Sequence, residues 1–253
     1  MVTASSAPAR YTFQGRTVTM PVVVRDATSA AATYVVDARA ARALLPGPEL
    51  DVVEIFPGRA LLSVACIDYR DNDLGDYNEV SLAFFVRERR APAGIPYLGT
   101  ALDVLRGRAA TWIWKLPVDQ SFTCEAGRGI WGFPKTVERI AVDDVGADRR
   151  WRLAVDGEDV LTFTAARGGR RRLADMEMVT FSWIDGRLHR TRFVSGADGV
   201  GIRLGGTAPT LGTHPIAQTL HDLGLPARPL MTVWMEHSHA TFAAPEPVST
   251  GAR

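Results

Sequence analysis

The sequence predicts a single α+β domain built mainly from antiparallel β-strands, with two or three short helices. Short stretches in which apolar and polar residues alternate recur along the chain, which is the period of half-buried strands. Two Asp-Gly pairs, at 156–157 and 185–186, separate such stretches and favour tight hairpin turns. No change in composition marks a linker, and 253 residues are compatible with one large β domain.

The N-terminal part begins with small and polar residues at 1–10, which we expect to be disordered. A strand is expected next, because four apolar residues alternate on one face: Val18, Met20, Val22 and Val24. Residues 33–37 predict another strand. Asp37 can then cap a short helix over residues 38–45.

The middle of the chain predicts further strands, separated by Pro-Gly and polar segments. Pro57-Gly58 is a turn signal, and residues 70–76 form a polar loop. Apolar residues at helical spacing predict a helix over 97–106. The expected strands are residues 52–56, 60–69, 79–86 and 110–116.

The C-terminal part predicts a meander, a hairpin, a helix and a last strand. The Asp-Gly turns lie within the first two of these features. Residues 195–212 are rich in glycine, and we expect them to be irregular. The main domain then spans residues 11–243, with a flexible tail at 244–253. The expected elements are strands 137–142, 150–155, 160–165, 178–184, 188–194 and 231–242, and a helix at 214–223.

Composition excludes several classes of function. A net charge of +1 gives no basic field that would recruit nucleic acid or an anionic membrane. Apolar runs are too short to span a bilayer, and the N-terminus lacks a signal pattern, so we expect a cytoplasmic protein. The two cysteines, Cys66 and Cys124, have no metal-ligand spacing. We therefore expect no metal and no cofactor.

The stretch Glu125–Thr136 is the most informative part of the sequence. It contains three glycines and a Trp-Gly-Phe-Pro segment that we interpret as a constrained turn leading into Lys135. Only two of the 29 basic residues are lysines, at 115 and 135. An amine can lose its proton and attack a carbonyl, whereas a guanidinium cannot. The alternative is that Lys135 is a solvated turn residue.

The segment Gly127-Arg-Gly-Ile-Trp-Gly-Phe-Pro-Lys135 resembles the active-site segment of the acetoacetate decarboxylase-like family, which ends in a lysine that forms a Schiff base. Two further segments resemble family motifs in the same order: Tyr11-Thr-Phe-Gln-Gly-Arg16 and Leu74-Gly-Asp-Tyr-Asn-Glu79. The resemblance implies a closed, barrel-like β architecture and a homo-oligomer. It also implies catalytic roles for Lys135, Glu79 and Arg16.

The resemblance implies iminium chemistry on a small oxo acid. The Lys135 amine would condense with the carbonyl, and the iminium would accept the electrons released when a 3-oxo acid loses its carboxylate. Glu79 would position the carbonyl or move protons, and Arg16 would hold the substrate carboxylate. Trp131 and Phe133 would contact the substrate and desolvate the amine, which lowers its pKa. The alternative roles are a surface ion pair for Arg16 and a solvated strand residue for Glu79.

Two departures from the family pattern leave the exact reaction open. Thr136 stands where the decarboxylases carry a second lysine, and the position of an acidic residue falls near Val64. An aldolase–dehydratase acting on a 2-oxo acid such as pyruvate is therefore an alternative. A non-catalytic protein that binds small hydrophobic carbonyl compounds is another.

Other polar motifs carry less information. In Glu236-His-Ser-His239 the alternation of a strand places Glu236 and His237 on opposite faces, which argues against a metal site. Glu236 could still face the interior. The roles of Glu125, Glu236 and His237 are left open.

Overall fold

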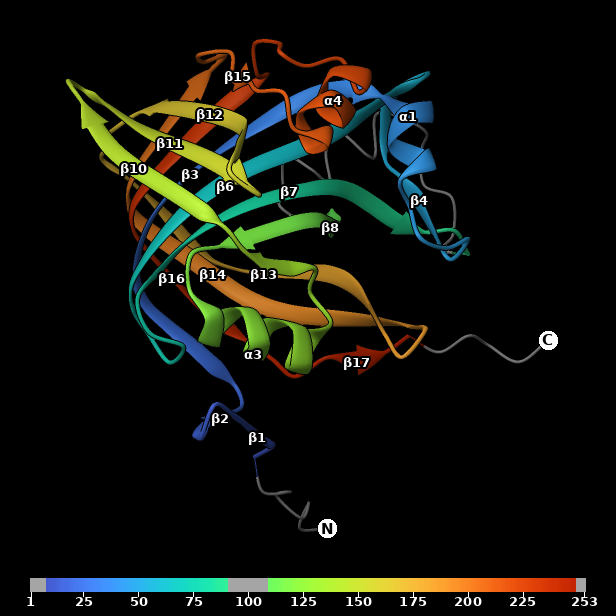
Figure 1. Cartoon of the computed structure of the whole chain (residues 1–253), viewed down its shortest axis with the longest axis vertical. Helices are drawn as coiled ribbons and strands as arrows, with labels where there is room; N and C mark the ends of the chain where they lie inside the picture. The colour runs from blue at the N-terminus through green and yellow to red at the C-terminus, as the bar shows by residue number, and fades with distance from the viewer. Residues whose placement is uncertain (1–7, 91–108, 249–253) are drawn as a thin grey trace.

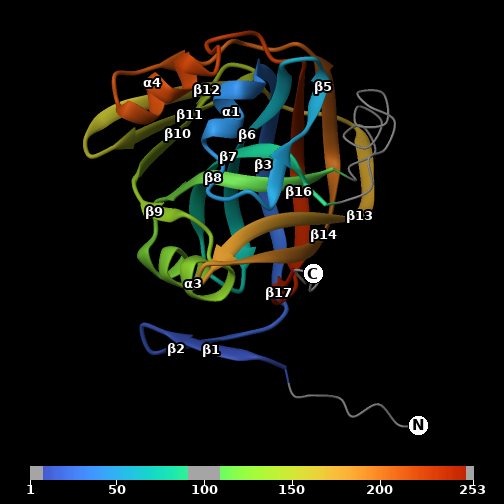
Figure 2. The same cartoon turned by 90° about the vertical axis from the view of Figure 1, so that its right-hand side faces the viewer.

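Seven strands form a closed barrel at the centre of the molecule (Figures 1 and 2). The computed structural model describes residues 8–90 and 109–248. The β7–β8 pairing closes the ring, and every neighbouring pair is antiparallel except the parallel pair β8–β13. In ring order the strands are β3 (Val22–Asp37), β6 (Arg59–Asn72), β7 (Tyr77–Glu88), β8 (Ala110–Val118), β13 (Arg171–Ile184), β14 (Arg187–Leu204) and β16 (Met231–Phe242).

A second, four-stranded sheet covers part of the outer face of the barrel. Its strands are β10 (Arg139–Val145), β11 (Asp148–Val155), β12 (Glu158–Ala166) and β15 (Thr210–Leu211). Helices α1 (Ala38–Ala43) and α4 (Pro215–Asp222) lie near the same end of the barrel (Figures 1 and 2). The large core between these layers includes Trp151 of β11 and Trp234 of β16, whose ring centroids are 6.2 Å apart.

Helix α3 (Ser121–Trp131) covers the opposite end of the barrel, and the hairpin of β1 (Arg10–Phe13) and β2 (Arg16–Thr19) lies beyond it (Figures 1 and 2). A second core forms there from residues of α3, the hairpin and the barrel strands. The remaining short strands are β4 (Leu50–Val52), β5 (Glu54–Phe56), β9 (Lys135–Val137) and β17 (Glu246–Pro247).

The predicted fold class is confirmed, and so are several local predictions. The Asp37 side chain accepts a hydrogen bond of 2.8 Å from the backbone N–H of Ala40 and so caps α1. Both residues of each Asp-Gly turn have positive φ, as a two-residue hairpin turn requires. The meander, the second hairpin, the helix near 215 and the last strand are all present.

Some predicted elements have other boundaries. Residues 195–204 are not irregular but belong to β14, because glycine in this strand allows close packing of backbones. A side chain at Gly201 would collide with the carbonyl oxygen of Gly168. The tail contains β17, which pairs with β14. The expected helix at 97–106 lies outside the described residues, and so do residues 1–7 and 249–253 of the two ends expected to be disordered or flexible, 1–10 and 244–253. Arg10 is not disordered, because it begins β1.

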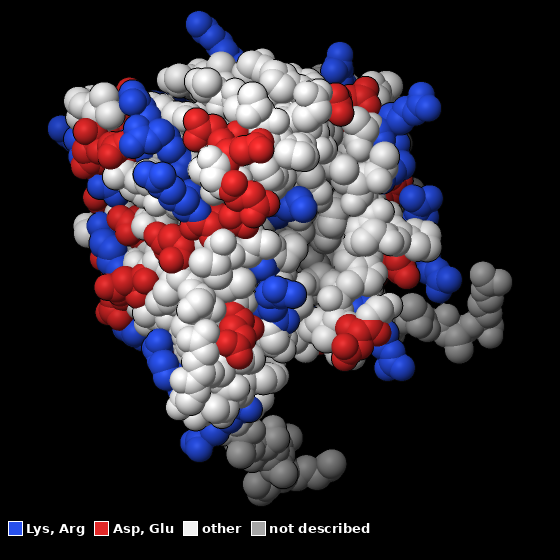
Figure 3. Space-filling view, in the orientation of Figure 1, with Lys and Arg blue, Asp and Glu red and all other residues white. Residues whose placement is uncertain are grey.

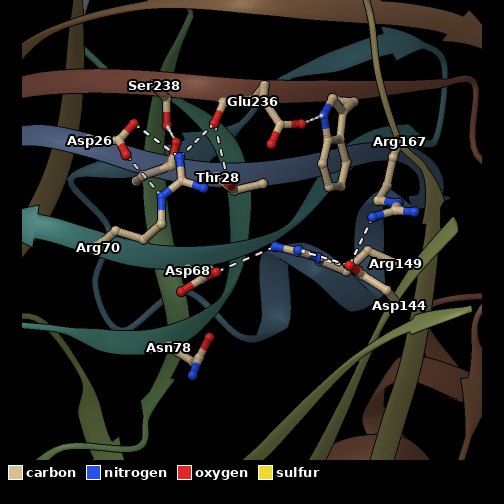
Figure 4. Close-up of polar contacts among 12 residues, drawn as sticks. Asp26, Thr28, Asp68, Arg70, Asn78, Asp144, Arg149, Arg167, Glu236 and Ser238 are labelled. Atoms are coloured by element: carbon tan, nitrogen blue, oxygen red, sulfur yellow. Dashed lines mark hydrogen bonds and ion pairs between the residues drawn. The ribbon is translucent and has the colours of Figure 1, made fainter.

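A network of charged residues ties the four-stranded sheet to the barrel (Figure 4). Arg149 of β11 pairs with Asp144 of β10 at 2.7 Å and with Asp68 of β6 at 3.3 Å. Arg70 pairs with Asp26 at 2.9 Å. Glu236 lies on this outer side of the barrel, where its carboxylate accepts a hydrogen bond of 2.8 Å from Trp234, so it does not face the interior.

Acidic and basic side chains are intermixed on the face that Figure 3 shows. This pattern agrees with the small net charge of +1. Among the described residues, no helix combines the length and the apolar character needed to cross a membrane.

The Trp151 side chain is expected to hold the two sheets together. It is 1% exposed, so Trp151→Ala removes a large buried ring and leaves a cavity. We expect the free energy of unfolding to fall by about 3–5 kcal/mol, measured by urea denaturation. As a control, Phe56→Ala removes a ring that is 65% exposed and should change the unfolding free energy by less than about 0.5 kcal/mol. Equal effects of the two substitutions would contradict this account of the core.

Candidate active site

The barrel encloses a cavity of about 310 Å³, to which all seven barrel strands contribute side chains. Most of the lining is apolar. Four of the five predicted site residues line it: Glu79, Trp131, Phe133 and Lys135. The cavity is therefore the candidate active site.

Lys135 follows the C-terminal end of α3, a helix that the sequence analysis did not predict. The constrained turn expected at Trp-Gly-Phe-Pro lies where the helix ends, because Gly132 terminates it in the left-handed conformation, with φ 65°. The chain then passes through Phe133 and Pro134 into β9, where Lys135 pairs with Leu116 of β8. This short strand fixes the backbone of the lysine against the barrel wall.

The glycines inside α3 leave room for side chains from other parts of the chain to lie close against the helix. A Cβ at Gly127 would lie 2.6 Å from Cδ of Lys135, and a Cβ at Gly129 would lie 2.5 Å from Cε1 of Phe13. Glycine within a helix costs about 1 kcal/mol relative to alanine. The helix therefore gives up stability to let the Lys135 side chain pass.

The Lys135 amine has three polar partners inside the cavity. Its Nζ lies 2.9 Å from Oε2 of Glu79 and donates to Oγ1 of Thr123 at 3.0 Å and to the hydroxyl of Tyr77 at 3.5 Å. The Tyr69 hydroxyl donates to the other Glu79 oxygen at 3.2 Å. Only 4% of the lysine side chain and 8% of the glutamate side chain are exposed. The two charges are thus buried together and hydrogen-bonded.

The electrostatics differ from the sequence-based expectation. Burial disfavours the ammonium and lowers the pKa of Lys135, as expected, but the Glu79 carboxylate and the Tyr77 hydroxyl favour the ammonium more strongly. The balance raises the pKa of Lys135 above its ordinary value, which is opposite in direction to the predicted net lowering. Burial also raises the pKa of Tyr69 and of Tyr77, which keeps both hydroxyls protonated; the Tyr69 hydroxyl donates to Glu79, and the Tyr77 hydroxyl accepts from Lys135.

Trp131 and Phe133 form an apolar wall beside the amine. Their rings stack with centroids 5.6 Å apart, and both residues are buried. The Trp131 indole N–H donates to the carbonyl oxygen of Ala243 at 2.9 Å, which fixes the ring against the chain after β16. Both rings line the cavity, and their contact with a substrate stays a prediction.

The structure does not bring Arg16 into the cavity. Arg16 lies on β2 with an exposed side chain, and its Cζ is 3.8 Å from the ring centroid of Phe122 on α3. It is not among the described residues that line the cavity. The motif match therefore identified an arginine near α3 but not a group that reaches the Lys135 amine within this chain.

Strand alternation explains where Thr136 and Val64, the two departures from the family pattern, lie in the structure. Thr136 is exposed, because consecutive residues of β9 point to opposite sides. Val64 is buried in the core outside the barrel, so it does not face the cavity. Its neighbours Ser63 and Ala65 do line the cavity. The inward positions on either side of Val64 are therefore small and uncharged.

Three residues that contact the Lys135–Glu79 pair were not predicted as site residues: Tyr69, Tyr77 and Thr123. Tyr77 could have been found, because it lies two residues before Glu79 and strand alternation puts both on one face. Thr123 lies one helical turn before Gly127, and only a helical reading of this segment would place it beside the lysine.

The residues whose roles were left open lie elsewhere. Glu125 accepts a hydrogen bond of 3.0 Å from Gln14, and so links α3 to the hairpin. His237 lies 3.1 Å from Asp26 on the outer side of the barrel. His239 lines the cavity, and its Nε2 lies 2.8 Å from the Asp175 carboxylate.

The model of the acetoacetate decarboxylase family matches residues 6–245 of the chain. An acetoacetate decarboxylase from Legionella pneumophila has a similar structure, with TM-score 0.64 and 17% identity over 90% of this chain and 87% of that one. The enduracididine biosynthesis enzyme MppR, in complex with pyruvate, gives TM-score 0.61 and 17% identity over 98% and 100%.

A third similar structure is an acetoacetate decarboxylase-like enzyme from Sphingomonas wittichii RW1, with TM-score 0.57 and 16% identity over 97% of this chain and all of that one. No curated protein matches the chain significantly. At these identities the structural matches support the barrel fold.

Substitution Glu79→Gln is expected to lower the pKa of Lys135, because it removes the carboxylate and leaves the burial unchanged. NMR of protein labelled with ¹³C-lysine can follow the titration, since the chain has only two lysines and Lys115 gives the reference signal. In the native protein the folded-state pKa lies above the unfolded one. The charged pair then stabilises the fold at neutral pH, and this contribution is lost as the pH rises through the folded-state pKa. An unchanged Lys135 titration in the variant would contradict the assigned pairing.

Substitution Gly127→Ala is expected to displace the Lys135 side chain, because the new methyl group would collide with it. The Lys135 signals should then shift in the same NMR experiment. Gly129→Ala is a matched control, since it makes the same change in the same helix but meets Phe13 instead. It should leave the Lys135 signals in place. Equal shifts in both variants would show that the helix, and not the close contact, positions the lysine.

Proposed function

The chain belongs to the acetoacetate decarboxylase family, and we propose that it is a Schiff-base-forming lyase that acts on an oxo acid through Lys135. One observation carries the proposal: a buried lysine amine lies 2.9 Å from a carboxylate inside a largely apolar cavity. A surface lysine would lack both the dry surroundings and a fixed proton acceptor. The alternative of a solvated turn lysine does not agree with a side chain that is 4% exposed.

The first step of the proposed reaction uses the Lys135–Glu79 pair. The ammonium passes one proton to the Glu79 carboxylate, which leaves a free amine and a neutral acid. The amine nitrogen then forms a bond to the substrate carbonyl carbon. Glu79 returns its proton to the former carbonyl oxygen, a second proton moves from the nitrogen to the resulting hydroxyl through the Glu79 carboxylate, and water leaves as the protonated imine forms. The hydroxyls of Tyr77 and Thr123 hold the nitrogen in place during these transfers.

The second step depends on the substrate. In a 3-oxo acid the bond between the carboxylate and the adjacent carbon breaks, carbon dioxide leaves, and the electron pair moves into the iminium to give an enamine. Protonation of the enamine carbon and hydrolysis of the imine release a ketone and restore the lysine. Apolar surroundings favour this step, because negative charge is dispersed as the carboxylate becomes carbon dioxide. Arg16 has no role in this scheme.

A condensation on a 2-oxo acid is the second candidate. In that reaction the imine loses a proton from carbon, the enamine attacks an aldehyde, and the adduct loses water. It is favoured by the likeness to MppR, whose solved complexes hold pyruvate and the condensation product of pyruvate with imidazole 4-carboxaldehyde. Both candidates share the same first step at Lys135, so one experiment tests that step for both.

Reduction with borohydride in the presence of acetoacetate or pyruvate is expected to attach the substrate carbons to Lys135, detected by peptide mass spectrometry. Lys135→Met should abolish the adduct, and Lys115→Met should retain it. Gas analysis with acetoacetate separates decarboxylation from condensation. A protein that forms no adduct with either acid, but binds an uncharged carbonyl compound, would be a binding protein and not a lyase.

A further inference from the structure

The inner face of three neighbouring strands is made of very small side chains. Ala31 of β3 pairs with Ala65 of β6, and Ala65 pairs with Ser81 of β7. Ser63 of β6 pairs with Ala83 of β7 in the next inward row. All five residues line the cavity. They form one continuous patch of the barrel wall, which we call the small-residue wall.

The outer face of the same strands carries large side chains. Tyr34, Leu62, Leu82 and Phe84 alternate with the small residues and fill the core between the barrel and the outer layer. The three strands therefore also carry large side chains. On the inner side, the small residues leave space that belongs to the cavity.

The small-residue wall extends the cavity away from the amine. Glu79, which marks the position of the Lys135 nitrogen, is four residues from Ala83 along β7. At about 3.3 Å per residue this is a distance of roughly 13 Å. Acetoacetate has only four carbons, so it would occupy the end near the amine and leave the other end unfilled.

The far end of the cavity offers no charged partner among the described residues. Among the lining residues within 8–90 and 109–248, the acidic and basic side chains are Lys135, Glu79 and His239, and His239 lies 2.8 Å from Asp175. The polar groups of the small-residue wall are the hydroxyls of Ser63 and Ser81. A second carboxylate at that end would be buried without a counter-ion, which is strongly unfavourable. An uncharged chain suits the surface better.

We propose that the cavity accepts an oxo acid, or the ketone derived from it, whose carbonyl carries an extended uncharged chain of roughly eight carbons. The inference rests on the proposed function and adds the substrate class. With a 3-oxo acid of this kind, the bond to the carboxylate breaks, carbon dioxide leaves, and a proton takes its place on the carbon. The product is a methyl ketone whose chain lies along the small-residue wall.

Reductive trapping with a series of methyl ketones tests the proposal without depending on decarboxylation. Acetone, heptan-2-one and decan-2-one differ only in chain length, and borohydride fixes each on Lys135. We expect the concentration that gives half-maximal trapping to fall at least about tenfold from acetone to heptan-2-one, because each added methylene removes apolar surface from water. Equal or weaker trapping of the longer ketones would overturn the inference and leave the lyase proposal standing. Absence of trapping with every ketone would overturn both.

Substitution at the far end of the small-residue wall locates the chain. In Ala83→Leu the added carbons occupy the space assigned to the chain, so the preference for decan-2-one over acetone should fall at least about tenfold. Ala43→Leu makes the same change at an exposed position of α1 and should retain the native preference. Ala83→Val is a smaller change that tests the same point if the leucine variant does not fold. An unchanged preference in a folded Ala83 variant would place the chain elsewhere and overturn the assignment.

Discussion

The ion pair between Lys135 and Glu79 is the constraint on which the rest of the site depends. Removing two charges from water costs several kcal/mol per ion, and their attraction offsets that cost only with good geometry and further hydrogen bonds. Here the amine also contacts Thr123 and Tyr77, and the carboxylate accepts from Tyr69. Four parts of the chain must therefore meet in one arrangement: α3, β7, β9 and the end of β6.

The raised pKa of Lys135 is relevant to how its amine would be activated. The Glu79 carboxylate outweighs the effect of burial and favours the protonated amine. In the proposed reaction the same carboxylate takes the proton, so activation would need no group from outside the site. The amine nitrogen and the carboxylate oxygen are already 2.9 Å apart, which is hydrogen-bond distance.

The sequence predicted the fold class well, because strand alternation and Asp-Gly turns are local signals. It failed where a residue's role depends on a distant partner. Gly127 was noted only as part of a glycine-rich segment, and the structure shows that it makes room for the Lys135 side chain. Val64 faces the outer core while its neighbours Ser63 and Ala65 face the cavity, because successive residues of a strand point to opposite faces. Arg16 matched a motif in type and order, but only coordinates show that its side chain rests on Phe122 outside the cavity.

The closed barrel affects which positions of the protein tolerate substitution during evolution. A ring of seven paired strands leaves no free edge, and its ladder of backbone hydrogen bonds does not involve the inward side chains. Some inward residues, such as Leu116 and Phe133, belong to the second core, whereas the five members of the small-residue wall belong to neither core cluster and have more freedom to change in size. Replacing alanine or serine of the small-residue wall by larger residues would change the specificity of the cavity. The barrel and Lys135 would stay the same.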